Sequence, residues 1–253
     1  MAKCQLCLQE NKLQNSHIIP NAIFKKLFRS NNGKAISLSS NAEQWIEHGS
    51  DSWHEELLCR DCEQLLSTNY EKYSIELLRG QHKNSDMVKS AGVKFSDVNV
   101  SKLCLFLLSI YWRAAVSKSP VFKNVQLHPK HQEYMRQAIL NNQILSKQLL
   151  TISGYRLHDS TKDGFTLNNL KGFISSPFMS HEFDTKTFCL TIEGFYFEVS
   201  SPGIRYSKLK TLNFLKVKSG DVFFPFKEVI SITPYFNLMV SSYGKYIEGQ
   251  TKL

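Results

Sequence analysis

Apolar and polar residues follow helical spacing in the first part of the chain. After Pro20, which suits a first helical turn, apolar positions recur three and four residues apart, and lysine and arginine occupy the other side. The same spacing predicts a second helix over about residues 60–78. The expected inner faces are Ile23, Phe24, Leu27 and Phe28 in the first helix, and Leu65, Leu66, Tyr70, Tyr73 and Leu77 in the second.

The middle of the chain is also patterned as helix. Residues 103–116 are apolar nearly all round, which predicts a buried helix capped by Asp97 or Ser101. A second helix is expected over about residues 131–150. Its expected buried side is Tyr134, Met135, Ile139, Ile144 and Leu149.

From Thr151 onward the pattern changes to that of β-strands. Residues 188–199 alternate and break at Glu193-Gly194, which predicts a hairpin. Further strands are expected over 212–217, 222–226 and 229–233. The predicted fold class is therefore α+β, with a small metal-bound module (residues 1–95), a helical segment (96–150) and an antiparallel β-rich region (151–253).

Composition narrows the class of protein. The chain has 253 residues, 42% of them hydrophobic and 21% charged, which excludes an intrinsically disordered or coiled-coil protein. The amino terminus lacks the apolar stretch of a signal peptide, and residues 103–116 are too few to cross a bilayer. A cytoplasmic protein without a membrane partner is expected, in a reducing compartment where cysteines serve as metal ligands more often than as disulfides.

Four of the six cysteines form two C-x2-C pairs, Cys4/Cys7 and Cys59/Cys62. A gap of two residues lets both thiolates of a pair face one ion, and two pairs complete the tetrahedral sulfur shell of structural zinc. Two redox pairs are the alternative, but neither pair stands in a thioredoxin-like setting. Such a zinc ion has no open position for water, so any catalytic metal must bind elsewhere.

Between the two pairs stands Ser16-His17-Ile18-Ile19-Pro20, and the second pair occurs as Leu57-Leu58-Cys59-Arg60-Asp61-Cys62-Glu63. With these motifs, about residues 1–80 resemble the HNH endonucleases of the ββα-metal class that carry a Cys4 zinc, including the endonuclease VII type. The resemblance implies a treble-clef or ββα-metal-like module that hydrolyses DNA phosphodiester bonds, in a setting such as phage defence or a mobile element. The rest of the chain matches no motif.

The resemblance also implies roles for individual residues. His17 corresponds to the general base that takes a proton from the attacking water, a task that suits the pKa of histidine. Glu63 takes the place of the Asn or His after the last cysteine, as a ligand of a catalytic Mg²⁺ or Mn²⁺. Ser16 stands where the family has a metal-binding Asp or His.

The charge of the chain indicates an acidic partner. The formal net charge is +9, and residues 11–42 contain lysines and an arginine but no acid. Lys25, Lys26 and Arg29 follow His17 on the predicted helix, where they would contact the phosphates of a nucleic acid, with DNA expected first. A solvated helix face is the alternative reading, and a protein partner stays open.

Plainer interpretations stay open for the candidate site. His17 would cap a loop beside the zinc, His48 and His54 would be exposed loop residues, and Glu63 would be a charge at a helix amino terminus. The second function hypothesis follows from these interpretations and from Ser16: a catalytically inactive, zinc-stabilised module that binds a nucleic acid or a protein partner.

Overall fold

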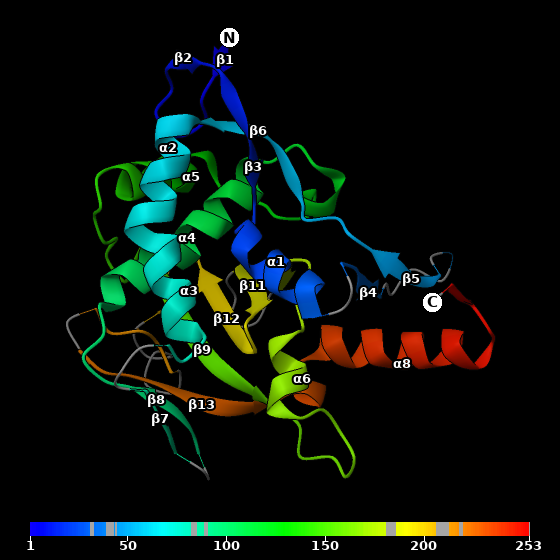
Figure 1. The fold of residues 1–253 in the computed structure, drawn as a ribbon. Helices are drawn as coiled ribbons and strands as arrows, with labels where there is room; N and C mark the ends of the chain where they lie inside the picture. The colour runs from blue at the N-terminus through cyan, green and yellow to red at the C-terminus, as the bar shows by residue number, and fades with distance from the viewer. Residues whose placement is uncertain are drawn as a thin grey trace.

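The fold is mixed α+β in the computed structural model (Figure 1). The structure describes residues 1–30, 33–38, 43, 45–81, 85–88, 91–180, 186–205, 213–217 and 220–252. A single cluster of buried side chains includes Leu6 and Leu58 near the amino terminus, Leu107 in the middle of the chain, and Phe197 and Phe224 in its last third. The three predicted domain boundaries stay predictions.

The amino-terminal region is built on two short antiparallel pairs. At the tip, β1 (Ala2–Lys3) pairs with β2 (Glu10–Asn11). Below it, β3 (Leu13–His17) pairs with β6 (His54–Cys59), with a register shift between Gln14 and Asn15. β1 and β2 are exposed throughout, whereas β6 buries its last three residues, Leu57–Cys59.

A long helical column follows β6 without a break (Figure 1). It consists of α2 (Arg60–Leu66), a π-helical segment η1 (Ser67–Glu71) and α3 (Lys72–Leu78). This confirms the helix predicted over 60–78. The wider turns of η1 shift the inner face between α2 and α3, and Tyr70 of η1 is fully buried with its hydroxyl on the carbonyl of Ile139 (2.7 Å).

Within the described residues, the largest sheet has seven strands, in the order β10-β11-β12-β9-β13-β8-β7. All neighbours are antiparallel except β13 and β9, which run parallel. Its strands are β7 (Ser85–Val88), β8 (Gly92–Phe95), β9 (Thr151–His158), β10 (Phe178–Ser180), β11 (Thr187–Ile192), β12 (Phe195–Ser200) and β13 (Val222–Glu228). The predicted hairpin at Glu193-Gly194 is confirmed as the β11–β12 turn.

Two helices of the middle segment fill the core next to this sheet. α4 (Val100–Val116) is buried along almost its whole length, as predicted, but its cap is Asn99, whose Oδ1 accepts from the Lys102 N–H (3.1 Å). α5 (Pro129–Leu140) packs against α4. No helix within the described ranges is long and apolar enough to cross a bilayer.

The remaining elements complete the fold. α1 (Asn21–Ser30) buries Ile23 and Phe24, as its spacing predicts. Near the carboxyl terminus, α8 extends along the lower right of Figure 1 and ends close to β5. The others are β4 (Ala35–Ser37), β5 (Ile46–Gly49), η2 (Pro120–Phe122), α6 (Leu167–Lys171), η4 (Val229–Ser231), α8 (Thr233–Ile247) and β14 (Thr251–Lys252), which pairs with β5.

Three expectations for the second half of the chain were wrong. The helix expected over 131–150 ends at Leu140, where Asn142 takes a positive φ of 53°, and Ile144 is exposed. Residues 229–233 form a 3₁₀ turn and the start of α8, because Pro234 fits a first helical turn. Over 213–217 the structure has an isolated bridge at Phe214, and Leu212 lies outside the described residues.

The prediction of an antiparallel β-rich region over residues 151–253 therefore describes only part of the sheet and only part of that region. The seven-stranded sheet takes β7 and β8 from the first region, includes one parallel pair, and leaves the chain end helical.

Candidate functional site

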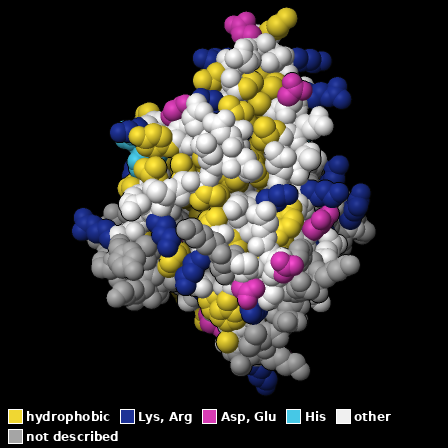
Figure 2. Space-filling model, turned by 90° about the vertical axis from the view of Figure 1, so that its left-hand side faces the viewer, with side chains coloured by type: hydrophobic (Ala, Val, Ile, Leu, Met, Phe, Trp, Pro, Cys, Tyr) yellow, Lys and Arg dark blue, Asp and Glu magenta, His cyan; other side chains and the backbone are white. Residues whose placement is uncertain are grey.

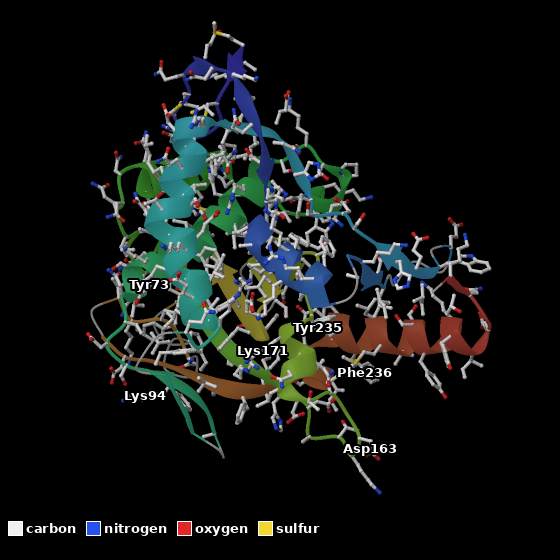
Figure 3. The ribbon with its side chains drawn as sticks, in the orientation of Figure 1. Tyr73, Lys94, Asp163, Lys171, Tyr235 and Phe236 are labelled. Atoms are coloured by element: carbon white, nitrogen blue, oxygen red, sulfur yellow. The ribbon has the colours of Figure 1, made fainter. Side chains whose placement is uncertain are left out.

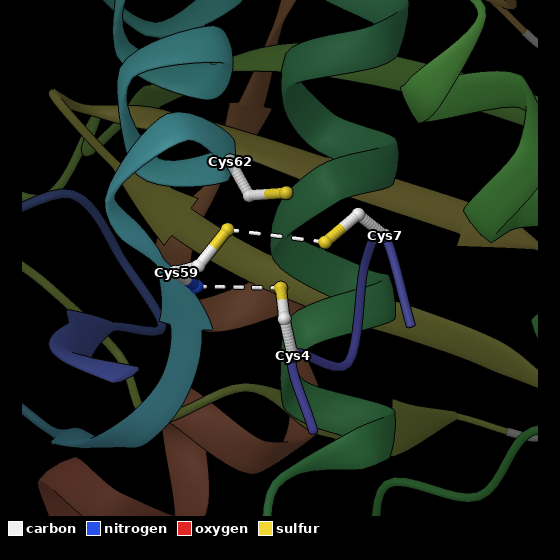
Figure 4. Close-up of side chains that lie close together, drawn as sticks. All are labelled: Cys4, Cys7, Cys59 and Cys62. Carbon is white, nitrogen blue, oxygen red and sulfur yellow. Dashed lines mark hydrogen bonds between the residues drawn. The ribbon is translucent and has the colours of Figure 1, made fainter. Parts of the chain in front are cut away.

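The four cysteines of the two C-x2-C pairs converge at one point (Figure 4). All four sulfur atoms lie within 4.8 Å of one another, and Cys7 Sγ is 3.9 Å from Cys59 Sγ. A tetrahedral ion with metal–sulfur bonds of about 2.3 Å holds its sulfurs about 3.8 Å apart. The cluster therefore fits a metal ion such as zinc, as the cysteine spacing predicts.

Local backbone geometry positions the two thiols of each C-x2-C pair. The first pair lies on a tight turn in which the Leu8 N–H donates to the Cys4 carbonyl (2.9 Å), with Leu8 at a φ of 64°. The second pair joins the last residue of β6 to the first turn of α2. The Cys59 N–H donates to Cys4 Sγ (3.3 Å), so the backbone of one pair supports the thiolate of the other.

The electrostatics of the thiols differ within the cluster. Burial acts to raise the pKa of Cys4, but N–H groups from Cys59, Cys7 and Leu6 outweigh it, and the pKa falls below its usual value. Burial raises the pKa of Cys62, and the neighbouring Cys4 raises it further. Four close thiols of this kind repel one another when ionised, and a divalent cation removes that repulsion.

Helix α5 secures the first cysteine pair from the core side. The Arg136 guanidinium donates to the Leu6 carbonyl (2.5 Å) between Cys4 and Cys7, and it is held in turn by Glu133 (2.7 Å). Arg136 is 7% exposed. Residues from the helical middle thus position the thiol cluster, a link that the local cysteine motif does not contain.

His17 ends β3 opposite His54, the first residue of β6. Its Nε2 lies 3.1 Å from Ser52 Oγ, and the same hydroxyl is 3.4 Å from His54 Nδ1, so one serine joins the two imidazoles. Burial lowers the pKa of His17, and His54, Arg113 and Lys25 lower it further. The ring is therefore neutral near pH 7, the form in which a histidine can accept a proton.

A buried ion pair fixes the backbone of His17. Arg113, 1% exposed on α4, donates to the His17 carbonyl (2.8 Å) and lies 2.9 Å from Glu71 Oε1 on η1. The pKa of Glu71 is raised by burial, with Arg113 acting against that shift and Glu63 adding to it. The end of β3 is thus joined to both α4 and the helical column.

The other residues that the resemblance singled out have different surroundings. Ser16 is fully buried, and its hydroxyl accepts from the Leu58 N–H (3.0 Å) inside the β3–β6 pair. Glu63 lies on α2, where its Oε1 is buried without a hydrogen bond among the described residues. In the described ranges, the four cysteines are the only group of three or more histidine, cysteine or acidic ligands close enough for an ion, so His17 and Glu63 share no such group.

The three cations expected to contact nucleic acid lie on the exposed side of α1 but differ in their partners. Lys26 forms an ion pair with Glu193 (2.7 Å), whereas Lys25 and Arg29 are exposed. Lys25 is close enough to His17 to lower its pKa. On the face drawn in Figure 2, basic and acidic side chains are interspersed.

A cavity of about 1270 Å³ opens beside the loop that carries Ser52. Asp51 and Trp53 line it, together with Phe24 and Phe28 of α1 and Tyr235 of α8. His48 lines the same cavity, on β5 rather than in a loop. Tyr235 lies close below α1 in Figure 3.

The sequence pattern assigned no site role to Ser52 or to Arg113, which lies within the buried helix predicted over residues 103–116. The signal available for Ser52 was its position two residues before His54. No local signal points from Arg113 to His17, which is 96 residues away in the chain. No family model matches this chain, and neither the curated proteins nor the solved structures give a match.

Proposed function

We propose that the protein is an HNH-like endonuclease that hydrolyses phosphodiester bonds of nucleic acid, DNA first, with His17 as the general base. The observation that carries the proposal is the setting of His17, a half-buried imidazole with a lowered pKa at the end of β3. The β3–β6–α2 unit that contains it follows the first cysteine pair and carries the second.

In phosphodiester hydrolysis His17 would act as the general base. Its neutral ring takes a proton from water, the resulting hydroxide attacks phosphorus, and the bond to the leaving oxygen breaks as that oxygen takes up a proton. Ser52 and His54 orient the His17 ring through contacts with the side chain of His17. Arg113 fixes the position of the residue through a hydrogen bond to its backbone carbonyl. The Mg²⁺ or Mn²⁺ that the resemblance implies stays a prediction, and no step is assigned to it.

Zinc in the cysteine cluster would have a structural role. Four thiolates complete its coordination and leave no position for water or substrate. The ion would join the tip of the chain to the start of α2, and so hold β3 and His17 in place against α4.

Basic residues near His17 support a polyanionic substrate. Lys25 and Arg29 are exposed on the helix that follows His17, and phosphate contacts supply much of the affinity for nucleic acid. These contacts would position a strand without selecting its sequence.

The test is cleavage of supercoiled plasmid and of single-stranded DNA, with Mg²⁺, Mn²⁺ or EDTA. The wild type is compared with His17→Gln and with His128→Gln, a matched change at an exposed histidine at the start of α5. We expect His17→Gln to lose roughly 10²–10⁴-fold in rate, the usual contribution of a general base, and His128→Gln to keep the wild-type rate. Full activity of His17→Gln would refute this assignment.

A second candidate function is a binding module without catalysis. It is favoured by Ser16, whose hydroxyl accepts a hydrogen bond from Leu58 inside the β3–β6 pair. It is also favoured by Glu63, whose Oε1 is buried. In that case the protein retards DNA in a gel, cleaves it under none of these conditions, and His17→Gln leaves the binding unchanged.

A further inference from the structure

The turn between β11 and β12 carries a buried carboxylate, Glu193, at a φ of 51°. Its side chain is 2% exposed. Lys26 of α1 lies 2.7 Å from one oxygen and Arg79, just after α3, lies 2.8 Å from the other. Glu193 therefore connects the helix that follows His17 to the end of the helical column.

Two more cations complete a group that we call the Glu193 cluster: Lys26, Arg79, Arg156, Lys171 and Glu193. Arg156 of β9 is buried, donates to the Glu193 carbonyl (2.9 Å) and to the Leu167 carbonyl (3.1 Å), and lies over the ring of Phe195. Burial lowers its pKa to about 10, partly offset by Glu193. A side chain at Gly194 would collide with this guanidinium, so the turn sequence is fitted to the cluster.

Lys171 differs from the other members of the cluster in its contacts. It ends α6, close below α1 in Figure 3, and Gly172 beside it approaches Leu27 of α1. Its ammonium makes no hydrogen bond or ion pair with any residue that the structure describes. Burial lowers its pKa, and repulsion from Arg156 and Lys26 lowers it further, with Glu193 acting in the opposite direction.

The cluster thus gathers four cations around one carboxylate. Partly buried charges of one sign repel strongly, and proteins normally balance them with partners. Glu193 and Arg156 form the buried floor, whereas Lys26, Arg79 and Lys171 are partly exposed at the rim. An anion that reaches the rim would meet lysine and arginine donors and relieve the repulsion on Lys171.

We propose that the rim of the Glu193 cluster binds a phosphate group of the nucleic-acid strand that crosses His17; this inference rests on the proposed function. α1 connects His17 to the rim of the Glu193 cluster. The charge of Lys25 lowers the pKa of His17, and the next residue, Lys26, belongs to the rim. Arg79 strengthens the connection by donating to the Ala22 carbonyl in the first turn of α1 (2.8 Å). The site would hold a phosphate beyond the one that is cut, and so fix the position of the strand.

The experiment measures binding separately from cleavage. Fluorescence anisotropy follows a short labelled DNA duplex in EDTA at several salt concentrations, with wild type, Lys171→Gln and the matched control Lys162→Gln. Lys162 precedes Asp163, which Figure 3 labels at the far end of its loop. We expect Lys171→Gln to weaken binding about three- to tenfold at low salt and to reduce the slope of log K against log salt by about one, and Lys162→Gln to change neither.

Thermal unfolding with inorganic phosphate, a mononucleotide or the duplex identifies the source of the phosphate. We expect the duplex to raise the Tm of wild type more than that of Lys171→Gln. Glu193→Gln removes the only negative member of the cluster, and if it folds, its Tm should rise more with added phosphate than that of wild type. Lys171→Gln could instead reduce the rise in Tm caused by phosphate or a mononucleotide but leave the rise caused by the duplex unchanged. That result would overturn the strand assignment in favour of a small ligand.

Equal affinities and salt slopes for wild type and Lys171→Gln would overturn the phosphate site and leave the cluster a structural ion-pair network. Failure of the nuclease proposal has a different signature: no cleavage, while the dependence of binding on Lys171 persists.

Discussion

The β3–β6 pair and the β11–β12 hairpin are stabilised by different physics. Every residue of β11 and β12 is buried, and the sheet on either side supplies hydrogen bonds and apolar contacts. Among the strands that the structure describes, β3 and β6 pair only with each other, and half or more of each strand is exposed or half-buried. The candidate catalytic strand β3 therefore relies on two anchors, the thiol cluster and Arg113, whereas the hairpin relies on burial.

Breaking the cysteine cluster should separate the two regions most strongly. If the cluster binds zinc as proposed, Cys59→Ser or chelation removes a stabilisation that is about 10 kcal/mol or more in small zinc modules. We expect hydrogen exchange to show loss of protection in β3 and β6, while β11 and β12 remain protected. Cys104→Ala, a buried cysteine of α4 outside the cluster, is the control and should leave β3 protected. Uniform loss of protection would show that the regions unfold together.

Arg113→Met tests the second anchor of β3. The change removes the donor to the His17 carbonyl and leaves Glu71 buried without its cation, so we expect a loss of about 3–5 kcal/mol in the free energy of unfolding. Urea denaturation measures it. Adding Glu71→Gln in the same chain should recover much of the loss, because the uncompensated charge disappears. A cost in the double variant equal to that of Arg113→Met would argue against the ion pair.

Gly194→Ala tests the hairpin side of the comparison. Gly194 has a φ of 77°, and a methyl group there would collide with the Arg156 guanidinium. We expect a cost of about 1–3 kcal/mol from the strained backbone together with the displaced side chain. Gly220→Ala is the matched control, since nothing lies close to its added methyl group. Similar thermal unfolding of both variants would contradict this account of the turn.

The smallest expected effect is the pH dependence contributed by His17. Its pKa in the folded protein lies below the ordinary value of 6.5, so the unfolded chain takes up the proton first as the pH falls. Stability is therefore lost as the pH drops below about 6.5 and through the folded pKa. We expect His17→Gln to lose less stability than wild type between pH 7 and pH 5, by a fraction of a kcal/mol. Parallel curves would argue against the lowered pKa.

The local part of the site was predictable because its signals are local. C-x2-C spacing predicted the cysteine cluster, and helical spacing predicted α1, the column from Arg60 to Leu78 and the buried α4. The Asn141-Asn142 pair, which ends α5, and Pro234, which begins α8, were also present in the sequence, but apolar runs around them outweighed these signals. Nuclease function, catalytic metal and nucleic-acid contacts stay predictions.

The two C-x2-C pairs, most helices and the β11–β12 turn could be predicted from the amino-acid sequence, because each depends on residues a few positions apart. The pairing of β8 with β13, the bond from Arg113 to His17 and the ion pair of Lys26 with Glu193, 167 residues away, are seen only in the folded chain. Periodicity indicates which face of an element is buried, whereas the partners of that face depend on how all the buried faces pack together.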